Sequence, residues 1–470
     1  MSHLLNHLIA VSPICRTADR TRMKLPQILI LILKFREYRR NQKLTRSELE
    51  AMQLRKFHKL VAHANQYSPY YADIIKTRSL DIATCRPQDF PVLTKSDLMT
   101  NFDRIVTDRR ITKSAVSDFL QRSKDPRELF LDDFYVIHTS GTSGEVGVFV
   151  FSKKDWACGM AQLGRFRPMP TPFRRQRIAL FSATDGHYAS VSWQNMMRQG
   201  INRHCFDLLS LEINSPLPRA IAQLNEFQPD SLGGYATILK VLAEKQREGS
   251  LKISPTEITS GGEVLGSRDR AMLEDAFGCP VINLYACSEN HVMGNSLAGE
   301  ADIFLWEDDL IFELHEDHTI VTNLYNFTLP LIRYRMADVL KPKARKNSTW
   351  PYTEIEGVIG RIENTPKFIN REGVGDFISP HTINEIFVPG VMRFQMQLTG
   401  SESFNFAVCL SPALSPQEAA EAVKGLRNRL DEILQQKMME NVAFVIVVVS
   451  DLPVDPKTRK FRLICSQIKT

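Results

Sequence analysis

The sequence predicts an α/β protein with a large N-terminal α/β domain that carries a β subdomain, followed by a small, mobile α+β C-terminal domain. Between residues 178 and 285, short apolar segments alternate with helical segments, as in a largely parallel sheet covered by helices. From Phe304 onward the pattern changes to β hairpins. After Gly360–Arg361 a ββαβ pattern begins, and it has the size of a small separate domain. We therefore place the large domain at 1–362 and the small domain at 363–470.

The composition is that of an ordinary globular protein. The 470 residues are enough for two or more domains, with 43% hydrophobic and 24% charged residues. A net charge of +6 is small for this length, so it permits anionic substrates but does not indicate nucleic-acid binding. The eight cysteines form no Cys-x-x-Cys pair, which argues against a disulfide framework or a zinc knuckle and favours a reducing compartment. We expect a cytoplasmic protein.

The most apolar N-terminal run, Ile28–Leu33, is far shorter than the ~20 residues that a membrane span needs. It begins too late for a signal peptide and lacks the small-residue cleavage site of one. A basic stretch follows, and such a stretch on a helix could contact a membrane surface. The favoured interpretation is a helix that docks on the domain with its basic face in solvent. The basic residues are Lys34, Arg36, Arg39, Arg40 and Lys43.

Helix-capping patterns locate two N-terminal helices. Thr45 and Glu48 form a capping box ahead of an apolar stripe at helical spacing, which predicts a helix from residue 45. Thr94 is the expected cap of a second helix. Residues 1–22 are expected to be irregular, and residues 101–134 mostly helical.

The alternating region supplies the expected sheet. Ligands bind at the carboxyl ends of strands in such sheets, and several loops rich in glycine and polar residues directly follow the strands. Strands are expected at 178–182, 231–235, 257–260 and 281–285, and helices at 218–227, 237–247 and 267–277. Later strands are expected at 305–309, 310–314, 319–324, 393–398, 405–410 and 442–449, with a helix at 415–436.

One segment has the composition of a phosphate-binding turn. Residues 139–144, Thr-Ser-Gly-Thr-Ser-Gly, lie between the apolar segments 135–138 and 148–151. Glycines allow a close approach of backbone to a ligand, and successive N–H groups can form a concave anion site. No Gly-Lys-Ser/Thr ends the turn, so it is not a Walker A loop. Taken alone, the segment fits an ordinary strand–turn–strand equally well.

Several ordered motifs, from about Leu44 to the C-terminus, resemble those of the adenylate-forming enzymes. Within them, the sequence is similar to the phenylacetate–CoA ligase-like branch, in which some members resemble capsule-biosynthesis proteins. Together the motifs make a chance resemblance unlikely, although each is weak alone. They are Thr139–Gly144, Ser260–Glu263, Tyr285–Glu289, Leu305–Asp309, Pro330–Asp338, Gly360–Asn364, Phe377–Glu385 and Lys460.

The resemblance implies a role for each motif residue. The loop would hold the β- and γ-phosphates of ATP through Thr139, Ser140, Gly141, Thr142, Ser143 and Gly144. Further nucleotide contacts would come from Gly262, Glu263, Tyr285, Ser288, Asp338 and Arg361, with Asp338 on the ribose hydroxyls. Glu289 would bind Mg²⁺. Lys460 would bridge the substrate carboxylate and the α-phosphate, with Lys457 competing for this role. Thr142, Glu289 and Lys460 form the implied catalytic set.

The implied reaction has two halves. A carboxylate attacks the α-phosphorus of ATP and releases pyrophosphate, and the small domain then rotates about a hinge near Glu363 to admit CoA or another thiol. A small carboxylic acid is the expected substrate, and the oligomeric state stays open, with a dimer as one option. By position, the acid pocket would include His187, Tyr188, Gly234, Tyr235 and Ala236.

The sequence departs from the family pattern at several motif positions. Glu145 places an anion near the phosphates, and Arg459 replaces the glycine before the catalytic lysine. Ala286 and Met336–Ala337 are further replacements, and Glu363–Asn364 replace the acidic pair at the hinge. Two alternatives therefore stay open. One is an adenylating enzyme whose acceptor is a carrier protein, an amine or a sugar. The other is a catalytically degenerate nucleotide-binding relative.

Overall fold

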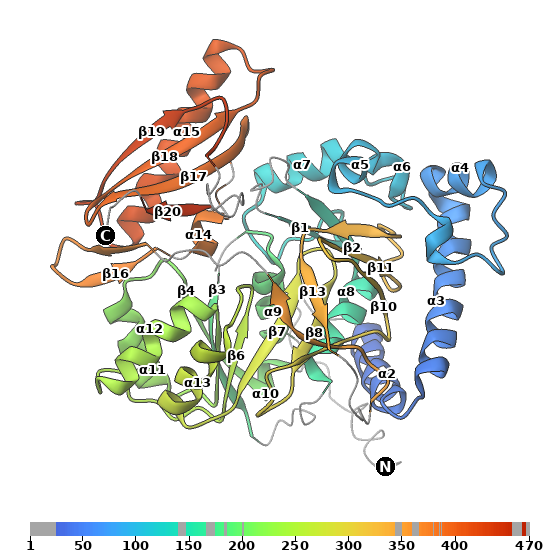
Figure 1. The fold of residues 1–470 in the computed structure, drawn as a ribbon, viewed down its shortest axis with the longest axis horizontal. Coiled ribbons are helices and arrows are strands. Elements are labelled where there is room, and N and C mark those ends of the chain that lie inside the picture. Colours follow the sequence, from blue (N-terminus) through green and yellow to red (C-terminus); the bar gives the residue numbers. More distant parts are fainter. Residues whose placement is uncertain are drawn as a thin grey trace, which may run out of the picture.

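A computed structural model of the chain has the expected mixed α/β architecture (Figure 1). It describes residues 25–139, 147–165, 174–182, 186–199, 202–343, 350–359, 366–378, 380–384, 386, 388–453 and 463–466. The predicted irregular N-terminus, 1–22, lies outside these ranges. The C-terminal unit lies at one end of the large sheet, above β3 (Gln176–Ser182) and β4 (Phe206–Glu212) (Figure 1). The helices α2 (Leu25–Asn41), α3 (Arg46–Tyr67) and α4 (Pro69–Thr77) lie on the opposite side of the molecule (Figure 1).

The main sheet has nine strands in the described part of the chain, in the order β13-β14-β9-β8-β7-β6-β5-β3-β4. The strands from β4 to β7 are parallel, and those from β7 to β13 pair antiparallel. Parallel strands need a helical crossover, which the sequence supplies between consecutive strands. The strands are β3 (Gln176–Ser182), β4 (Phe206–Glu212), β5 (Ser231–Gly234), β6 (Glu257–Gly261), β7 (Val281–Cys287), β8 (His291–Ser296), β9 (Ile303–Leu305), β13 (Val339–Pro342) and β14 (Glu354–Ile359).

Three helices pack beside the parallel strands and confirm the expected alternation. A buried apolar cluster joins them to the sheet and includes Leu224, Leu239, Ile258 and Leu273. The helices are α11 (Leu217–Phe227), α12 (Ala236–Arg247) and α13 (Ser267–Phe277). Four further helices lie near the sheet: α8 (Lys153–Met160), η2 (Ala161–Gly164), α9 (Ala189–Met197) and α10 (Asn202–Cys205).

The capping patterns place the N-terminal helices correctly. The hydroxyl of Thr45 accepts a hydrogen bond from the Glu48 N–H, and the Glu48 carboxylate accepts one from the Thr45 N–H. Thr94 forms the same arrangement with Asp97. The elements of this region are α2 (Leu25–Asn41), α3 (Arg46–Tyr67), α4 (Pro69–Thr77), η1 (Pro87–Asp89), α5 (Lys95–Thr100), α6 (Phe102–Ile105) and α7 (Lys113–Arg122).

The expectation of mostly helical structure at 101–134 is wrong, because only α6 and α7 form there. The Asp108 carboxylate accepts a hydrogen bond from the backbone N–H of Arg110, and Asp125 does the same for Arg127. Such bonds two residues along the chain stabilise turns at the expense of the helix.

The remaining β structure forms hairpins. β1 (Phe134–His138) pairs antiparallel with β2 (Val148–Ser152), as the strand–turn–strand interpretation predicts. β10 (Leu310–Leu314), β11 (Thr319–Asn323) and β12 (Tyr334–Met336) form a three-stranded sheet. The expected strand at 305–309 is wrong, because β9 ends at Leu305 and the next four residues turn toward the N-terminal helices.

This turn, residues 306–309, holds the N-terminal helices to the sheet through buried charges. Asp309 accepts hydrogen bonds from Lys34 at 3.0 Å, Tyr38 at 2.8 Å and Lys56 at 2.6 Å. Its neighbour Asp308 accepts from Arg165, from Asn41 at 2.8 Å and from Tyr352 at 3.1 Å. Glu307 accepts from Arg46 at 2.7 Å. Because each carboxylate has several donors, these charges can be buried.

The two lysines decide the protonation state of Asp309. Burial opposes ionisation of this carboxyl group, but the charges of Lys34 and Lys56 outweigh it and hold the pKa of Asp309 well below its usual range. The folded-state pKa is therefore below the unfolded-state value. Asp309 stabilises the fold above the ordinary pKa of an aspartate, and this contribution is lost as the pH falls toward the folded-state pKa.

The C-terminal unit has its own sheet and apolar core. The sheet order is β19-β18-β17-β20, and α15 covers one face through Leu426, Leu430 and Ile433. The elements are β17 (Val391–Gly400), β18 (Ser403–Leu410), α15 (Pro416–Gln436), β19 (Ala443–Val448) and β20 (Ile464–Ser466), preceded by β15 (Lys367–Ile369), β16 (Gly375–Phe377) and α14 (Pro380–Asn384). The predicted boundary at 362/363 falls among residues outside the described ranges and stays a prediction.

A buried ion pair within this unit, between Asp376 and Lys437, forms hydrogen bonds with the segment 215–217 of the large unit. The Asp376 carboxylate on β16 accepts a hydrogen bond from Lys437 at 3.2 Å and another from the backbone N–H of Leu217, at the start of α11, at 3.2 Å. Thr382 donates to Asn214 at 2.8 Å beside it. Asp376 is therefore placed to couple the two units.

Among the helices of the described ranges, none combines the length and the apolar character needed to cross a membrane.

We expect the substitution Asp309→Asn to lower the free energy of unfolding by about 1.5–3 kcal/mol, the size of a hydrogen bond to a charged group. The half-buried ammonium groups of Lys34 and Lys56 then keep only Glu37 as an anionic partner. Asp317→Asn is the matched control, since Asp317 is exposed. Urea and thermal unfolding followed by circular dichroism would measure the difference. Equal unfolding midpoints for the two variants would contradict this account of the acidic turn.

Candidate active site

The candidate site lies where three adjacent parallel strands end. In the register of the sheet, Gly234 on β5 lies opposite Ser260 on β6, and Gly261 on β6 lies opposite Leu284 on β7. The turns after these strands therefore meet at one edge, which is where α/β sheets bind ligands. This edge brings together three of the predicted site segments, namely residues 234–236, 262–263 and 285–289.

Gly262 has a backbone conformation that favours glycine. Its φ is +76°, and a Cβ atom there would lie 2.8 Å from Cε1 of the Tyr235 ring. The turn after β6 therefore packs directly on the ring of Tyr235, which is buried. Tyr235 also precedes α12 as its N-terminal cap residue. Two of the predicted site segments thus form one packed unit.

Glu263 is held by the start of α12. Its carboxylate accepts hydrogen bonds from the Thr237 N–H at 2.9 Å and from the Thr237 hydroxyl at 3.1 Å. The first turn of a helix favours a negative charge, so this contact is stabilising. It fixes the side chain of Glu263 and leaves the backbone of residues 262–263 as the part of the turn that can face a nucleotide. Ala236 is buried in the same first turn.

A hydrogen bond joins β7 to the turn between β12 and β13. The Tyr285 hydroxyl donates to the Asp338 carboxylate at 2.9 Å. Burial, followed by the charge of Asp338, raises the pKa of Tyr285 well above its usual value, so the hydroxyl stays protonated. Asp338 is half-buried. The Asp338 carboxyl group therefore has a fixed donor in Tyr285 and can also accept hydrogen bonds from hydroxyl groups of a ligand.

Glu289 lies just beyond the end of β7, two residues after Cys287. Burial raises the pKa of this carboxyl group; the charge of Lys95 lowers it, and the charge of Asp338 raises it. Lys95, at the start of α5, donates from Nζ to the Thr139 hydroxyl at 3.0 Å. It was not among the predicted site residues. The sequence offered no signal for it, because Lys95 there is only the first residue of a well-capped helix.

The β1–β2 hairpin brings both ends of the predicted phosphate loop together. The Thr139 N–H donates to the Gly147 carbonyl at 2.8 Å, and the Gly147 N–H donates to the Thr139 hydroxyl at 2.9 Å. Thr139 is thus the described end of the loop. Several predicted site residues lie outside the described ranges, and their roles stay predictions. They are Ser140, Gly141, Thr142, Ser143, Gly144, Arg361, Lys457 and Lys460.

His187 and Tyr188, which follow β3, contact different parts of the protein. His187 is buried, 3.1 Å from the Ser123 hydroxyl, and its ring lies 4.7 Å from the Phe119 ring. Burial lowers the pKa of His187, so it is neutral at physiological pH. The ring of Tyr188 lies 4.5 Å from the ring of His138, the residue before Thr139. Tyr188 therefore lies beside the hairpin, whereas His187 packs against α7.

The arrangement around Glu289 fits a hard cation that is completed by substrate. Mg²⁺ is usually bound by one or two carboxylates together with phosphate oxygens and water. A single half-buried carboxylate next to the hairpin meets this requirement. In the described ranges, no group of three or more His, Cys, Asp or Glu side chains could hold a metal without such help.

Known proteins are similar to this chain in sequence. The chain is 24% identical to protein CapK of Staphylococcus aureus over 331 residues, which cover 67% of this chain and 68% of CapK. It is 25% identical to phenylacetate-coenzyme A ligase of Aromatoleum evansii over 348 residues, 65% of this chain and 69% of that enzyme. No protein-family model matches the chain.

The fold is shared with solved structures of 2-hydroxyisobutyryl-CoA ligase. With that enzyme in complex with 2-HIB-AMP and CoA, the TM-score is 0.56 at 18% identity, over 91% of this chain and 92% of the other. With its postadenylation state the TM-score is 0.54 at 16% identity, over 91% of both chains. These similarities show that the chain shares the fold of that enzyme. This mixed α/β fold is the one expected from the sequence.

Gly262 offers a direct test of the packed turn. We expect Gly262→Ala to lower the free energy of unfolding by about 1–2 kcal/mol, because a side chain at positive φ is strained and the Tyr235 ring must move. Gly375→Ala is the control, since a Cβ atom there meets no atom within 4 Å. Chemical denaturation would compare the two, and equal stability would show that the turn does not pack as described.

Proposed function

We propose that this protein activates a small carboxylic acid with ATP to form an acyl- or aryl-adenylate and pyrophosphate, and then transfers the acyl group to a thiol such as that of CoA. The observation that carries this proposal is the convergence of three groups at one sheet edge: the Tyr285–Asp338 pair, the Glu289 carboxylate, and Lys95 on the hairpin hydroxyl of Thr139. The relationship to a phenylacetate-coenzyme A ligase supports the same reaction class.

In the first half-reaction, a substrate carboxylate oxygen attacks the α-phosphorus and the bond to pyrophosphate breaks. Asp338 accepts hydrogen bonds from the ribose, and Tyr285 holds that carboxylate in place while its ring flanks the adenine. The hairpin that begins at Thr139 holds the β- and γ-phosphates. Lys95 stabilises the negative charge of the departing pyrophosphate, because its ammonium group already lies on the hairpin.

Glu289 would hold Mg²⁺, which supplies charge neutralisation at the phosphate oxygens. The residue suits this role because it is half-buried and acts in a site from which water is partly excluded. Its raised pKa means that it must lose its proton to act as a ligand. Lys95 favours this ionised form by its positive charge.

In the second half-reaction, a thiolate attacks the acyl carbon and AMP leaves. The resemblance assigns Lys460 to the first half-reaction and a hinge near Glu363 to the exchange of domain positions between the two. The contacts that Asp376, Lys437 and Thr382 make with residues 214–217 would have to break in such a rotation. The acceptor is a thiol in this proposal, and a carrier-protein thiol, an amine or a sugar are the alternatives.

The acid would bind beside the ends of β3 and β5. Tyr188 lies next to the hairpin, and Gly234, Tyr235 and Ala236 lie at the edge that carries the nucleotide residues. An aromatic side chain there suits a flat acid. His187 contributes to this pocket only indirectly, because its ring packs against Phe119 and Ser123.

We further propose a cytoplasmic location. The seven cysteines in the described ranges are free thiols, which suits a reducing compartment. The proposal is compatible with a carrier protein as a partner and with a dimer. Size-exclusion chromatography with light scattering would test both.

We expect carboxylate-dependent exchange of pyrophosphate into ATP with at least one acid of a panel of aryl and acyl acids. Glu289→Gln should lower this exchange by about 100-fold or more, since loss of one group that stabilises transition-state charge has effects of this size. Glu300→Gln is the control, because Glu300 is exposed away from the site. Measurable ATP binding without exchange for any acid would contradict the proposal and indicate a degenerate relative.

The electrostatic link between Lys95 and Glu289 predicts a shift in the pH profile. Burial raises the pKa of Glu289, and the charge of Lys95 partly offsets this. Lys95→Met should therefore raise the pKa of Glu289 further and move the acidic limb of the exchange rate to higher pH. Lys252→Met, at an exposed lysine, should leave the limb in place. A lower rate with an unshifted acidic limb would contradict this link.

A further inference from the structure

Helix α2 is fixed to the protein by one face only. Lys34, Tyr38 and Asn41 follow one another at helical spacing and bond to the acidic turn. Tyr38 and Asn41 are buried, with 0% and 1% of their surface exposed. The opposite face of α2 is therefore held rigidly toward the outside of the molecule.

The outward face is basic and lacks compensating acids. Leu33, Arg36 and Arg40 lie on one strip of α2 at spacings of three and four residues, and Arg39 lies beside it. Lys43 follows in the turn after the helix. All four cations are exposed, and none forms an ion pair with another residue in the part of the chain that the structure describes. The inward cations differ, since Lys34, Lys56 and Arg46 each pair with a carboxylate. We call Arg36, Arg39, Arg40 and Lys43 the outer basic face.

An apolar side chain continues this face toward the N-terminus. Leu33 is 53% exposed, and Ile32 beside it is only partly buried. Leu33 lies one turn before Arg36 on the same strip. At a membrane interface, apolar side chains enter the acyl boundary and cations meet phosphate groups. Leu33 and the neighbouring arginines offer one group of each kind on the same side of α2.

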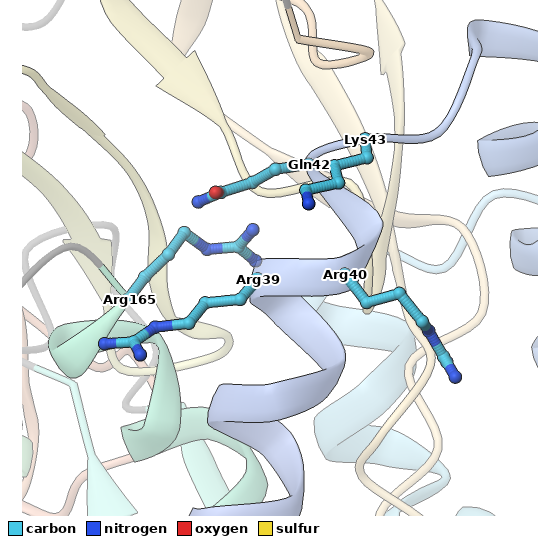
Figure 2. Close-up of a pocket in the computed structure, with 5 residues that line it drawn as sticks. All are labelled: Arg39, Arg40, Gln42, Lys43 and Arg165. Carbon is cyan, nitrogen blue, oxygen red and sulfur yellow. The ribbon is translucent and has the colours of Figure 1, made fainter.

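A shallow hollow lies against the outer basic face. It has a volume of about 620 Å³ and is lined by Arg39, Arg40, Gln42, Lys43 and Arg165, with no carboxylate among them. Figure 2 shows Arg39, Gln42 and Lys43 on the side of α2 that faces Arg165, whereas Arg40 points away from them. Arg165 is buried and donates to Asp308, Gln162 and Tyr352. The uncompensated charge of the hollow therefore comes from the end of α2 and from Lys43 in the turn after it.

We propose that the outer basic face, together with Leu33, docks the protein on an anionic phospholipid surface. The charge of the face matches lipid phosphates, and the hollow has room for a phosphate-bearing headgroup. Leu33 favours a lipid surface over a soluble anion, because a free phosphate gives an exposed leucine no apolar partner. The proposal concerns the region of α2 and does not depend on the proposed reaction at the carboxyl ends of β5, β6 and β7.

The test is co-sedimentation with vesicles of equal parts phosphatidylglycerol and phosphatidylcholine, compared with phosphatidylcholine alone. We expect binding to the anionic vesicles only, and a loss of affinity as the salt concentration rises. The triple variant R36Q/R40Q/K43Q should bind about 100-fold more weakly, at about 1 kcal/mol for each cation at an anionic surface and tenfold for each 1.4 kcal/mol. Leu33→Ser should weaken binding roughly tenfold.

The matched control is K252Q/R268Q/K424Q, which removes the same charge from exposed positions on other elements. It should bind like the wild type, and thermal unfolding should show that both triple variants are folded. Equal binding to the two vesicle types would overturn the proposal, as would equal losses in the two triple variants. Tight binding of inorganic pyrophosphate that is lost in R36Q/R40Q/K43Q, without any vesicle binding, would overturn it in favour of a soluble anion.

Discussion

Parallel pairing of β5, β6 and β7 is the constraint on which the candidate site depends. It places the carboxyl ends of three consecutive strands at one edge, so residues far apart in the sequence become neighbours without any long loop. The Tyr285–Asp338 hydrogen bond then adds the turn after β12, and Lys95 adds the start of α5. A strand register shifted by one residue would separate these groups and turn their side chains to the other face of the sheet.

The second feature is the acidic turn at 306–309, which fixes the position of the N-terminal helices although burying its carboxylates costs free energy. Burying three carboxylates is expensive, and it is tolerated here because donors from α2, α3 and Arg165 reach each of them. The same pairing decides which face of α2 points outward. One set of ion pairs thus both holds the N-terminal helices on the sheet and leaves the outer basic face exposed.

Local signals in the sequence were enough for much of the fold and for part of the site. The capping boxes at Thr45 and Thr94 and the strand–helix alternation were confirmed, because both depend on neighbouring residues. The strand expected at 305–309 was wrong because the partners of Asp309 lie more than 250 residues away, beyond any local pattern. Lys95 was missed for the same reason, since only the folded chain brings it to Thr139. The resemblance predicts roles for Asp338 and Glu289, and these stay predictions; the structure adds Tyr285 as the partner of Asp338 and the charge of Lys95 near Glu289.

The central claim is that this edge of the sheet is a nucleotide site that activates an acid. A crystal structure with Mg²⁺ and a non-hydrolysable ATP analogue tests it most directly. The account predicts ribose hydroxyls within hydrogen-bond distance of the Asp338 carboxylate, the metal on Glu289, and the phosphates on the β1–β2 hairpin beside Lys95. A nucleotide bound elsewhere, or one whose ribose and metal lie away from Asp338 and Glu289, would contradict it.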